Sequence, residues 1–398
     1  MVTTFYPPAH FGGDAMYVYR LSNALARRGH LVTVVHSLDA YRALGGAAPA
    51  GPFPNHSNVE VVALEGRLPL ARSLATYLSG RPALQARRLT EVFASADFDV
   101  VHFHNVSLVG GPGVLGYGKG VKLYTLHEHW LACPMHVLWR LNRELCERPT
   151  CIRCSLAYRR PPQPWRYTSL LERELAHVDL FLSPSAFAAE AHARRGLRLP
   201  VRVLPYFLPT TEAKDGGAGA EPARPFFLFV GRLEKLKGVQ TLVDVFREYD
   251  AADLLIAGNG RLARELRRAV AGLPHVRLLG FLHPTELQAL YARALALLVP
   301  SLCYEVFGIV ALEAFAQRTP VIMRDRGGLS EVVEESGGGF VYRTDAELLE
   351  SMERLRRDPV LRAGLGARGH EAWLRRWSEG PHLEAYFDAI EAARAGSA

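Results

Sequence analysis

Short apolar runs alternate with amphipathic helical patterns along both halves of the chain. In the first half the apolar runs predict buried strands at 31–36, 59–64, 100–104, 123–127, 180–183 and 201–204, with helices such as 15–28 between them. The second half predicts strands at 226–230, 253–257, 276–279, 296–300, 320–323 and 339–341, and helices at 238–248, 262–271, 284–293 and 309–317. Apolar β-branched runs separated by helices are typical of parallel sheets covered on both faces. We therefore predict two doubly wound α/β domains.

The boundary between the domains is predicted from composition. The stretch 209–225 is crowded with glycine, proline, alanine and charged residues, as expected of a linker. This places an N-terminal domain at 1–208 and a C-terminal domain at 226–380. A last helical pattern at 381–393, within the segment 381–398, follows the second sheet and is expected to cross back to the first domain. The length of 398 residues agrees with two cores rather than one.

The start of the chain has an unusual first strand, because only residues 2–5 precede a turn. Either the strand is short or the true N-terminus lies upstream. The following Phe11-Gly12-Gly13-Asp14 predicts a glycine turn into a helix, where backbone N–H groups and the helix dipole favour an anion. A turn without any ligand is the alternative, and the glycine pair alone does not decide between them.

The composition is that of an ordinary globular protein, with 49% hydrophobic and 22% charged residues. No run reaches the ~18 uncharged apolar residues that a membrane helix needs. The first residues also lack the basic and apolar regions of a signal peptide, so we expect a cytoplasmic protein. The formal net charge of +7 favours acidic partners, but charge alone does not choose among nucleic acid, anionic lipid and phosphorylated small molecules.

One stretch of the first half is both basic and aromatic. Its arginines face only Glu144 and Glu147 and alternate with aromatic residues: Arg140, Arg143, Arg148, Arg153, Arg159, Arg160 and Arg166 with Trp139, Tyr158, Trp165 and Tyr167. A solvated surface is one interpretation. A surface that meets an anionic acceptor or the headgroups at the inner face of the cell membrane is the other.

Two motifs after predicted strands of the second half suit an anionic ligand. Arg232 and Lys237 follow the strand 226–230, and ligands of open α/β sheets bind at that edge. The Arg232 fork and the compact Lys237 charge could neutralise a diphosphate without a metal. Gly258 and Gly260 end the next strand and allow close approach to the backbone. The spacing of a dinucleotide fingerprint is missing, which gives no support to a dehydrogenase.

The most specific motif pairs two glutamates across a loop-to-helix junction. Glu305 precedes the predicted helix 309–317 and Glu313 lies inside it. Eight helical steps correspond to roughly 12 Å, so the two carboxylates could contact opposite ends of an extended ligand with the helix N-terminus between them. A sugar nucleotide has this layout of hydroxyls, diphosphate and hydroxyls. A buried structural carboxylate and a surface charge are the alternatives.

These motifs, together with Pro320-Val321-Ile322, Gly327-Gly328 and Glu331, closely resemble family 4 of the retaining glycosyltransferases. The resemblance spans nearly the whole second domain and implies a GT-B fold, with two Rossmann-like domains facing a central cleft. It implies that Arg232 and Lys237 bind the donor diphosphate, Glu305 the transferred sugar and Glu313 the ribose. Backbone groups of Phe307, Gly308 and Ile309 would meet phosphate and sugar, and Gly280-Phe281-Leu282 resembles the base-contacting loop.

The first half resembles the family less closely. Gly12-Gly13 matches the N-terminal glycine turn, and Thr125-Leu126-His127-Glu128 is similar to a Thr-Leu-His-Asp segment of the family. Glu128 replaces the usual aspartate, which puts any role of that shorter carboxylate in doubt. We expect His127 to contact the donor sugar, with a histidine at the edge of the core as the alternative. His102 and His104 alternate on a predicted strand and are expected to face opposite sides.

The resemblance implies a hexose-type sugar transferred with retention from a UDP or GDP donor, without a protein nucleophile. Asp97-Phe98-Asp99 matches a metal-binding pattern of other transferases but precedes a strand of the first domain, so no catalytic metal is expected. Expected acceptors are a growing cell-surface polysaccharide, a lipid-linked saccharide or a metabolite, with no nucleic-acid partner. A non-catalytic sugar-nucleotide-binding protein and a nucleotide-sugar epimerase are the alternatives.

Four of the five cysteines fall within 22 residues: Cys133, Cys146, Cys151 and Cys154. Cytoplasmic thiols stay reduced, so a metal site is favoured over disulfides. The Cys151–Cys154 spacing suits half of a tetrahedral zinc site, and Cys133 and Cys146 could complete it. Such a zinc ion would be structural and would hold the basic excursion at about 128–168. Free thiols, or a mixed site with His129 or His136, are the alternatives.

Overall fold

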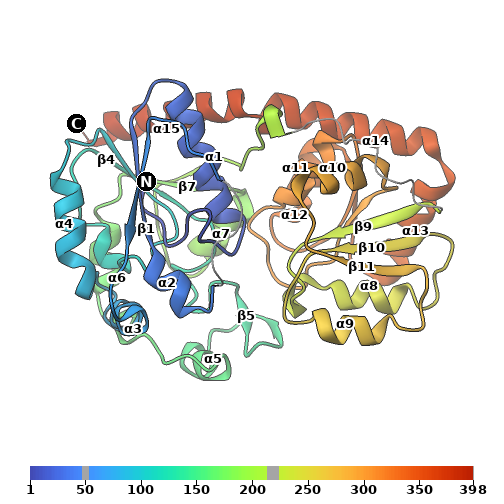
Figure 1. Cartoon of the computed structure of the whole chain (residues 1–398), viewed down its shortest axis with the longest axis horizontal. Helices are drawn as coiled ribbons and strands as arrows, with labels where there is room; N and C mark the ends of the chain where they lie inside the picture. The colour runs from blue at the N-terminus through green and yellow to red at the C-terminus, as the bar shows by residue number, and fades with distance from the viewer. Residues whose placement is uncertain (47–52, 213–223, 398) are drawn as a thin grey trace. The chain divides into compact units, whose positions relative to one another are not determined.

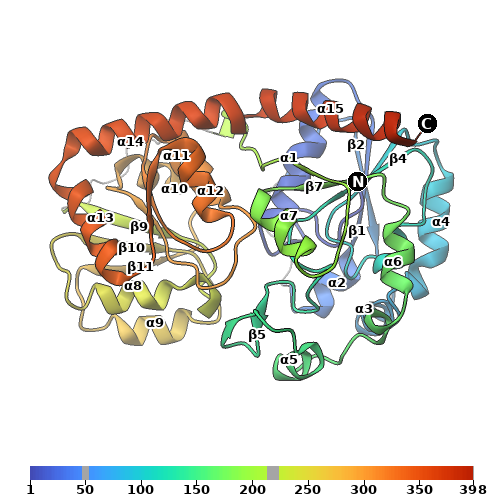
Figure 2. The same ribbon diagram turned by 180° about the vertical axis from the view of Figure 1, so that it is seen from behind.

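The computed structural model describes residues 1–46, 53–212 and 224–397. The chain divides into two compact units, each with its own parallel sheet (Figures 1 and 2). Unit 1 comprises Met1–Pro205 and Leu383–Ala398, and unit 2 comprises Tyr206–His382. Within the predicted linker 209–225, residues 213–223 lie outside the described part of the chain.

The strands of unit 1 are parallel and lie within two residues of the predicted positions. They form a pair, β1-β2, and a four-stranded sheet in the order β3-β4-β7-β8. Their bounds are β1 (Val32–Ser37), β2 (Val59–Leu64), β3 (Val100–Phe103), β4 (Val121–Thr125), β7 (Leu180–Ser183) and β8 (Val201–Val203).

The strand predicted at residues 2–5 is reduced to isolated bridges. Val2 pairs in parallel with Val35 of β1 and with Phe103 of β3. Backbone bonds from Val2 to His102, 2.8 Å, and from Thr3 to Val35, 3.0 Å, continue this pairing. The segment therefore joins the β1-β2 pair to the four-stranded sheet, although it is too short to count as a strand.

Helices surround the unit 1 sheet and cover a core that includes Val2, Phe103, Leu126, Trp130 and Phe181. The helices are α1 (Gly13–Arg27), α2 (Leu38–Ala43), α3 (Pro69–Ser79), α4 (Ala86–Ala94), α5 (Cys151–Ala157), α6 (Leu170–Leu175) and α7 (Ala186–Ala193). Unit 1 also has the 3₁₀ turns η1 (Ala83–Gln85), η2 (Pro112–Val114) and η3 (Pro164–Tyr167). A further 3₁₀ turn, η4 (Thr210–Glu212), belongs to unit 2. The excursion after β4 also forms a small antiparallel hairpin of β5 (Trp139–Arg140) and β6 (Glu144–Leu145).

Unit 2 has a six-stranded parallel sheet in the order β11-β10-β9-β12-β13-β14. Its strands match the predicted ones to within one residue: β9 (Phe226–Val230), β10 (Asp253–Ala257), β11 (Val276–Gly280), β12 (Leu297–Val299), β13 (Val321–Arg324) and β14 (Gly339–Tyr342). The chain builds outward from β9 to β11 and then returns to the other side of β9 with β12. Strand order reverses there, and open α/β sheets bind ligands at such a switch point.

The helices of unit 2 close both faces of this sheet over a core that includes Phe227, Phe246, Ile256 and Ile322. They are η5 (Lys235–Lys237), α8 (Val239–Val245), α9 (Ala263–Ala269), α10 (Pro284–Arg293), α11 (Ile309–Ala316), α12 (Leu329–Ser336), α13 (Asp345–Arg357), α14 (Pro359–Ala372) and the π-helical η6 (Trp373–Trp377). The predicted helix 381–393 lies within α15 (Glu379–Ser397). None of the described helices is long and apolar enough to cross a membrane.

Two glycines of α14 give a matched test of packing in unit 2. A Cβ added to buried Gly366 would lie 1.9 Å from the Arg318 carbonyl oxygen, whereas a Cβ on Gly364 would meet nothing closer than 3.8 Å. We expect Gly366→Ala to lower the free energy of unfolding by about 1–3 kcal/mol through overpacking. Gly364→Ala should raise it by up to about 1 kcal/mol through helix propensity. Urea denaturation followed by circular dichroism measures both, and equal effects would contradict this packing.

Candidate active site

The candidate site of unit 2 lies where β9, β10 and β12 end. Gly231 follows β9, Gly258 follows β10, and their backbones are close enough that a Cβ on Gly258 would stand 1.9 Å from the Gly231 carbonyl oxygen. Gly258 also has φ 137°, which side-chain-bearing residues rarely adopt, and its N–H donates to Gly280 at 2.7 Å. Gly258 must therefore be glycine, because the backbone at this point contacts the residue that follows β9 and the last residue of β11.

The loop that carries Glu305 is fixed by two further glycines in the left-handed region. Gly238, at φ 72°, approaches Pro300 so closely that a Cβ would lie 2.0 Å from its carbonyl oxygen. Gly327, at φ 70°, approaches Glu305 in the same way, with 2.3 Å between its added Cβ and the Glu305 carbonyl oxygen. The Gly328 N–H donates to that same carbonyl at 2.8 Å. The loop after β12, which carries Glu305, is thus held between Gly238, which follows β9, and Gly327, which follows β13.

The carboxylate of Glu305 is held by a lysine and a serine. Its Oε1 accepts a hydrogen bond from Lys237 Nζ at 2.6 Å and from Ser301 Oγ at 2.7 Å. The Glu305 and Lys237 side chains are only 17% and 28% exposed, so solvent screens the pair weakly. This arrangement brings together two of the predicted site residues.

Electrostatics keeps both members of this pair charged. Burial opposes the charge on Glu305, but the attraction of Lys237 and the hydrogen bonds from Lys237 and Ser301 outweigh it, so the pKa of Glu305 lies below its ordinary value. Burial also opposes the charge on Lys237, and Glu305 outweighs it, so the pKa of Lys237 is raised. Cys303 lies close to the pair; burial, and then the Glu305 charge, raise the pKa of its thiol to about 12. Cys303 therefore stays protonated and offers no thiolate nucleophile.

The second predicted glutamate lies on α11 and is oriented by a tyrosine. The buried Tyr291 of α10 donates its O–H to Glu313 Oε2 at 2.9 Å. Burial, and then the Glu313 charge, raise the pKa of Tyr291 well above its ordinary value, so the phenol remains a donor. Glu313 is thus a positioned carboxylate one α11 turn beyond the helix start.

The start of α11 is built for close packing. Gly308 caps the helix, and a Cβ there would lie 2.9 Å from Leu329 and Met323. Phe307 is buried, and its ring contacts Tyr206 and Trp377 edge-on. This packing fixes the position of the N-terminus of α11, whose first backbone N–H groups follow Glu305 closely in the chain.

The other predicted residues of unit 2 are more open. The Arg232 side chain is 55% exposed and lies 3.5 Å from Glu234 Oε1. Phe281 follows β11 and is 76% exposed, and Leu282 follows it. Gly260 lies against the backbone of Leu233, with 2.4 Å between an added Cβ and the Leu233 carbonyl oxygen. Of these groups, Arg232 lies near enough to Glu305 and Lys237 for its charge to act on both.

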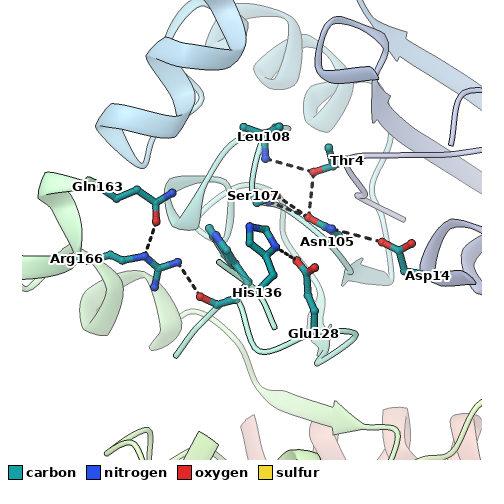
Figure 3. Close-up of polar contacts among 10 residues, drawn as sticks. Thr4, Asp14, Asn105, Ser107, Leu108, Glu128, His136, Gln163 and Arg166 are labelled. Carbon is teal, nitrogen blue, oxygen red and sulfur yellow. Dashed lines mark hydrogen bonds and ion pairs between the residues drawn. The ribbon is translucent and has the colours of Figure 1, made fainter. Parts of the chain in front are cut away.

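In unit 1 the predicted glycine turn is the start of a helix. Gly12 is the N-cap of α1, Gly13 its first residue, and Asp14 lies in its first turn. Figure 3 shows the polar contacts beneath it: Asn105 Nδ2 donates to Asp14 Oδ2 at 3.4 Å, and Thr4 Oγ1 donates to Asn105 Oδ1 at 3.3 Å. Residues after β3 therefore fix the first turn of α1.

The expectation that His102 and His104 face opposite sides is wrong. Their rings lie 4.0 Å apart. Side chains two residues apart along a strand point to the same face, so the alternation of the strand places His102 and His104 together rather than on opposite sides. His102 lies 3.0 Å from the Tyr386 hydroxyl and 2.7 Å from Thr125 Oγ1. His104 Nδ1 lies 2.9 Å from Nε2 of His127.

His127 therefore belongs to a buried histidine cluster after β3 and β4. Its ring meets Tyr17 of α1 edge-on at 5.2 Å. Burial lowers the pKa of His127 to about 4, although Asp14 opposes the shift, and burial with the two neighbouring rings lowers that of His104 well below its ordinary value. His104 and His127 are neutral at physiological pH, so His127 is suited to hydrogen bonding rather than to charge.

The excursion after β4 is tied down by two further contacts in Figure 3. His136 Nδ1 lies within hydrogen-bonding distance of Glu128 Oε1, and Arg166 Nε donates to Gln163 Oε1. Arg166 also donates to the carbonyl oxygens of Leu131 and Trp130, at 3.1 and 2.7 Å. Arg166 also lies over the Trp165 ring at 4.5 Å. Arg166, Trp139 and Trp165 are thus packed inside, which corrects the expectation that the whole basic and aromatic stretch forms a surface.

The structure brings the four clustered cysteines together. Cys133, Cys146, Cys151 and Cys154 line one small cavity, and all are free thiols. Burial, and then Cys133, raise the pKa of Cys146 and Cys151. Within the described ranges, no group of three or more His, Cys, Asp and Glu side chains is already arranged to hold a metal ion. The zinc site stays a prediction.

A hollow of unit 1 lies at the other end of its sheet. Its volume is about 500 Å³, and its lining includes Asp97, Asp99, Gly120 and Asp179, which precede β3, β4 and β7. Ligands of α/β sheets bind beyond the carboxyl ends of strands, so this hollow is not the candidate site.

Comparison with known proteins identifies the family. Residues 11–212 match the family described as Glycosyltransferase Family 4, and residues 211–372 match Glycosyl transferases group 1. The chain belongs to glycosyltransferase family 4. It is similar to alpha-maltose-1-phosphate synthase of Mycobacterium tuberculosis, 33% identical over 40% of this chain and 46% of that protein. It is also similar to glycogen synthase of the same organism, 28% identical over 90% of this chain and 86% of that protein.

This member of family 4 has the GT-B fold of its solved neighbours. Sucrose-phosphate synthase from Thermosynechococcus elongatus aligns with a TM-score of 0.75 and 21% identity over 99% of this chain and 98% of that one. Anabaena HepE in complex with UDP aligns with a TM-score of 0.66 and 16% identity, covering 98% of each chain. The chain spans between a third and a half of the length of the first curated relatives that it matches.

Sequence reasoning did not find Ser301 and Tyr291, which hold the two glutamates. Ser301 follows Pro300 directly at the end of β12, a position that places a side chain at the ligand-binding edge. Tyr291 adds a polar group to the otherwise buried side of α10. The sequence did not indicate that Tyr291 contacts Glu313, because the two residues are 22 apart in the chain. Ser301 lies only four residues from Glu305, but its position does not show which way its hydroxyl points.

The ion pair of Glu305 gives a pH-dependent prediction. Glu305→Gln leaves Lys237 without its partner and should lower the free energy of unfolding at pH 7 by about 1–3 kcal/mol. The pKa of Glu305 is lowered on folding, so its contribution is present above the unfolded pKa and is lost as the pH falls through the folded value. The wild type should therefore lose stability on acidification more steeply than the variant. The exposed Glu334→Gln is the control, and unfolding curves from pH 3 to 7 that coincide for all three proteins would contradict the pair.

Proposed function

We propose that this glycosyltransferase transfers a hexose-type sugar, with retention, from a UDP- or GDP-linked donor to a saccharide, a lipid-linked saccharide or a metabolite. The observation that carries the proposal is Glu305, charged and held by Lys237 and Ser301 immediately before α11, which carries Glu313. A sugar nucleotide needs contacts of this kind along its length: hydroxyl acceptors at both ends and positive charge at the diphosphate.

The proposed donor contacts follow from the positions in unit 2. Lys237, Arg232 and the N–H groups at the start of α11, at Gly308 and Ile309, would bind the diphosphate. Glu305 would accept hydrogen bonds from hydroxyls of the sugar. Glu313, oriented by Tyr291, would accept them from the ribose. Phe307, Gly258, Gly260, Phe281 and Leu282 would complete the donor site.

Retention without a protein nucleophile is the proposed chemistry. The acceptor oxygen bonds to the anomeric carbon on the face from which the diphosphate departs, and the acceptor proton passes to the departing phosphate oxygen. Lys237, Arg232 and the α11 dipole would stabilise the charge that grows on the leaving group. Two features support this: Cys303 is protonated, and Glu305 is already bound by two donors.

The contacts of unit 1 with the donor are also a proposal. Gly12 and Gly13 at the start of α1 would face phosphate, and neutral His127 would hydrogen-bond to the sugar. UDP is the first nucleotide to test, because the structural neighbour HepE was solved with UDP.

Donor binding predicts selective stabilisation by one nucleotide. At a concentration 100 times its dissociation constant, the right nucleotide should add about 2.7 kcal/mol to the stability of the folded state. Thermal unfolding with UDP, GDP, ADP and their sugars measures this effect. Glu313→Gln and Arg232→Ala should abolish or strongly reduce the shift, whereas the controls Glu334→Gln and Arg247→Ala, both exposed, should keep it.

The outcomes separate an enzyme from a binding protein. No shift with any nucleotide would contradict the donor site. A shift without acceptor-dependent release of nucleoside diphosphate would favour a non-catalytic sugar-nucleotide-binding protein. Nuclear magnetic resonance of the product's anomeric proton tests retention, since an inverted linkage would exclude the proposed chemistry.

We also propose that one surface of unit 1 rests on an anionic membrane, where a lipid-linked acceptor would be found. Around α3, Leu68, Leu70 and Leu74 are 66%, 67% and 43% exposed, and on α5, Ile152 and Leu156 are 51% and 60% exposed. The two helices lie near each other in both views, and Tyr77 of α3 donates its O–H to Pro161 after α5, at 3.0 Å.

Basic residues accompany these exposed apolar side chains. Arg67, Arg81, Arg153, Arg159 and Arg160 are all exposed in the same two segments. Apolar side chains that enter the interface, with arginines for anionic headgroups, are the features of peripheral membrane binding.

Vesicle binding tests this surface. The protein should sediment with vesicles that contain phosphatidylglycerol and much less with pure phosphatidylcholine, and added salt should weaken binding. Replacing Leu70 and Leu74 with glutamate should reduce binding at least tenfold, because the same α3 face then repels the headgroups. Val360→Glu, at a still more exposed apolar residue of unit 2, is the control. Equal binding by both variants would contradict the surface.

A further inference from the structure

The four clustered cysteines come from three separate structural positions of the excursion. Cys133 precedes the β5-β6 hairpin and Cys146 directly follows it, whereas Cys151 and Cys154 lie one turn apart on α5. Residues three apart on a helix share a face, so both thiols of α5 can point to the same side. Convergence of a hairpin and a helix face is needed to bring all four to one place.

The space between these thiols suits a single small ion. The cavity that they line has a volume of about 10 Å³, close to that of one water-sized sphere. Cys133, Cys146 and Cys154 are buried, and Cys151 is partly exposed, which leaves an entry side. The remaining lining includes Pro134, Trp139 and Thr150.

A backbone donor already points at one sulfur. The N–H of Leu141 donates to Cys154 Sγ at 3.3 Å. This contact comes from the hairpin and reaches a thiol of α5, so it joins the two halves of the cluster.

The backbone around the cluster is irregular. β5 and β6 have two residues each, and His136, Leu138, Leu141 and Asn142 all have positive φ without being glycine. For a residue such as Leu138 or Leu141 this conformation costs roughly 1–2 kcal/mol. A bound metal is one way in which small irregular segments are stabilised.

We propose that Cys133, Cys146, Cys151 and Cys154 bind one Zn²⁺ as a structural site. Zinc takes four thiolates in a tetrahedron, which leaves no open position for catalysis. The thiols line the cavity, but in the described part of the chain they are not arranged as a coordination sphere. Binding the ion would require the cysteine side chains to rotate about their Cα–Cβ bonds. Binding would exchange the thiol protons for one metal ion.

The site would fix the excursion that follows His127. Glu128 and His136, which pair with each other, lie between β4 and the hairpin, so a closed zinc site would hold their segment in place. This role is independent of the proposed donor site, because none of the four cysteines is among the proposed donor contacts and no nucleotide takes part.

Metal analysis of the full chain, purified without a metal-binding tag, tests the proposal. The wild type should contain one zinc ion per chain, and X-ray absorption should show four sulfur neighbours at about 2.3 Å. Cys151→Ser and Cys154→Ser should each lower the zinc content at least tenfold. Cys303→Ser, which removes the buried cysteine of unit 2, should leave it unchanged.

The wild type alone can overturn the proposal, so a variant that fails to fold does not obscure the result. Folded wild type incubated with excess Zn²⁺ and then dialysed would contradict the site if it held less than a tenth of an ion per chain. Disulfides among the four cysteines, found by mass spectrometry of the freshly purified protein, would contradict it as well. Nitrogen in the coordination sphere would replace the four-thiolate site by one that includes His129 or His136.

Discussion

The ion pair of Lys237 with Glu305 is the interaction on which the candidate donor site of unit 2 depends. Its members are 68 residues apart, and neither lies in a strand or an α-helix. The pair forms because Gly238 and Gly327 let the loops after β9, β12 and β13 approach to backbone contact. Without those glycines, the two charges would be presented by loops free to move apart, and the start of α11 would lose its fixed neighbour.

The two units present different electrostatic surroundings to a ligand. In unit 2, Glu305 is held charged by Lys237 and Ser301 against its burial, and Glu313 is oriented by Tyr291. In unit 1, His104 and His127 pack against each other and are kept neutral by burial. Unit 2 thus offers fixed charges, and unit 1 offers neutral hydrogen-bonding groups.

The excursion of unit 1 combines an interior and an exterior that the sequence does not separate. Arg166 and Trp165 pack inward and bind backbone carbonyls, while Ile152, Leu156 and neighbouring arginines remain at the surface. Of the four clustered cysteines in this segment, Cys133, Cys146 and Cys154 are buried and Cys151 is partly exposed. One short segment thus carries both a candidate metal site and part of a candidate membrane surface.

The sequence by itself determined the strands, the two-domain α/β fold and the family, because the period of apolar residues and the spacing of glycines and charges are local properties. It could not determine which side chains meet. The contact of Tyr291 with Glu313 and that of His104 with His127 depend on how strand ends and helices pack. The strand expected at residues 2–5 is present only as bridges from Val2 to Val35 and to Phe103. Tertiary structure decided these points because they join residues far apart in the chain.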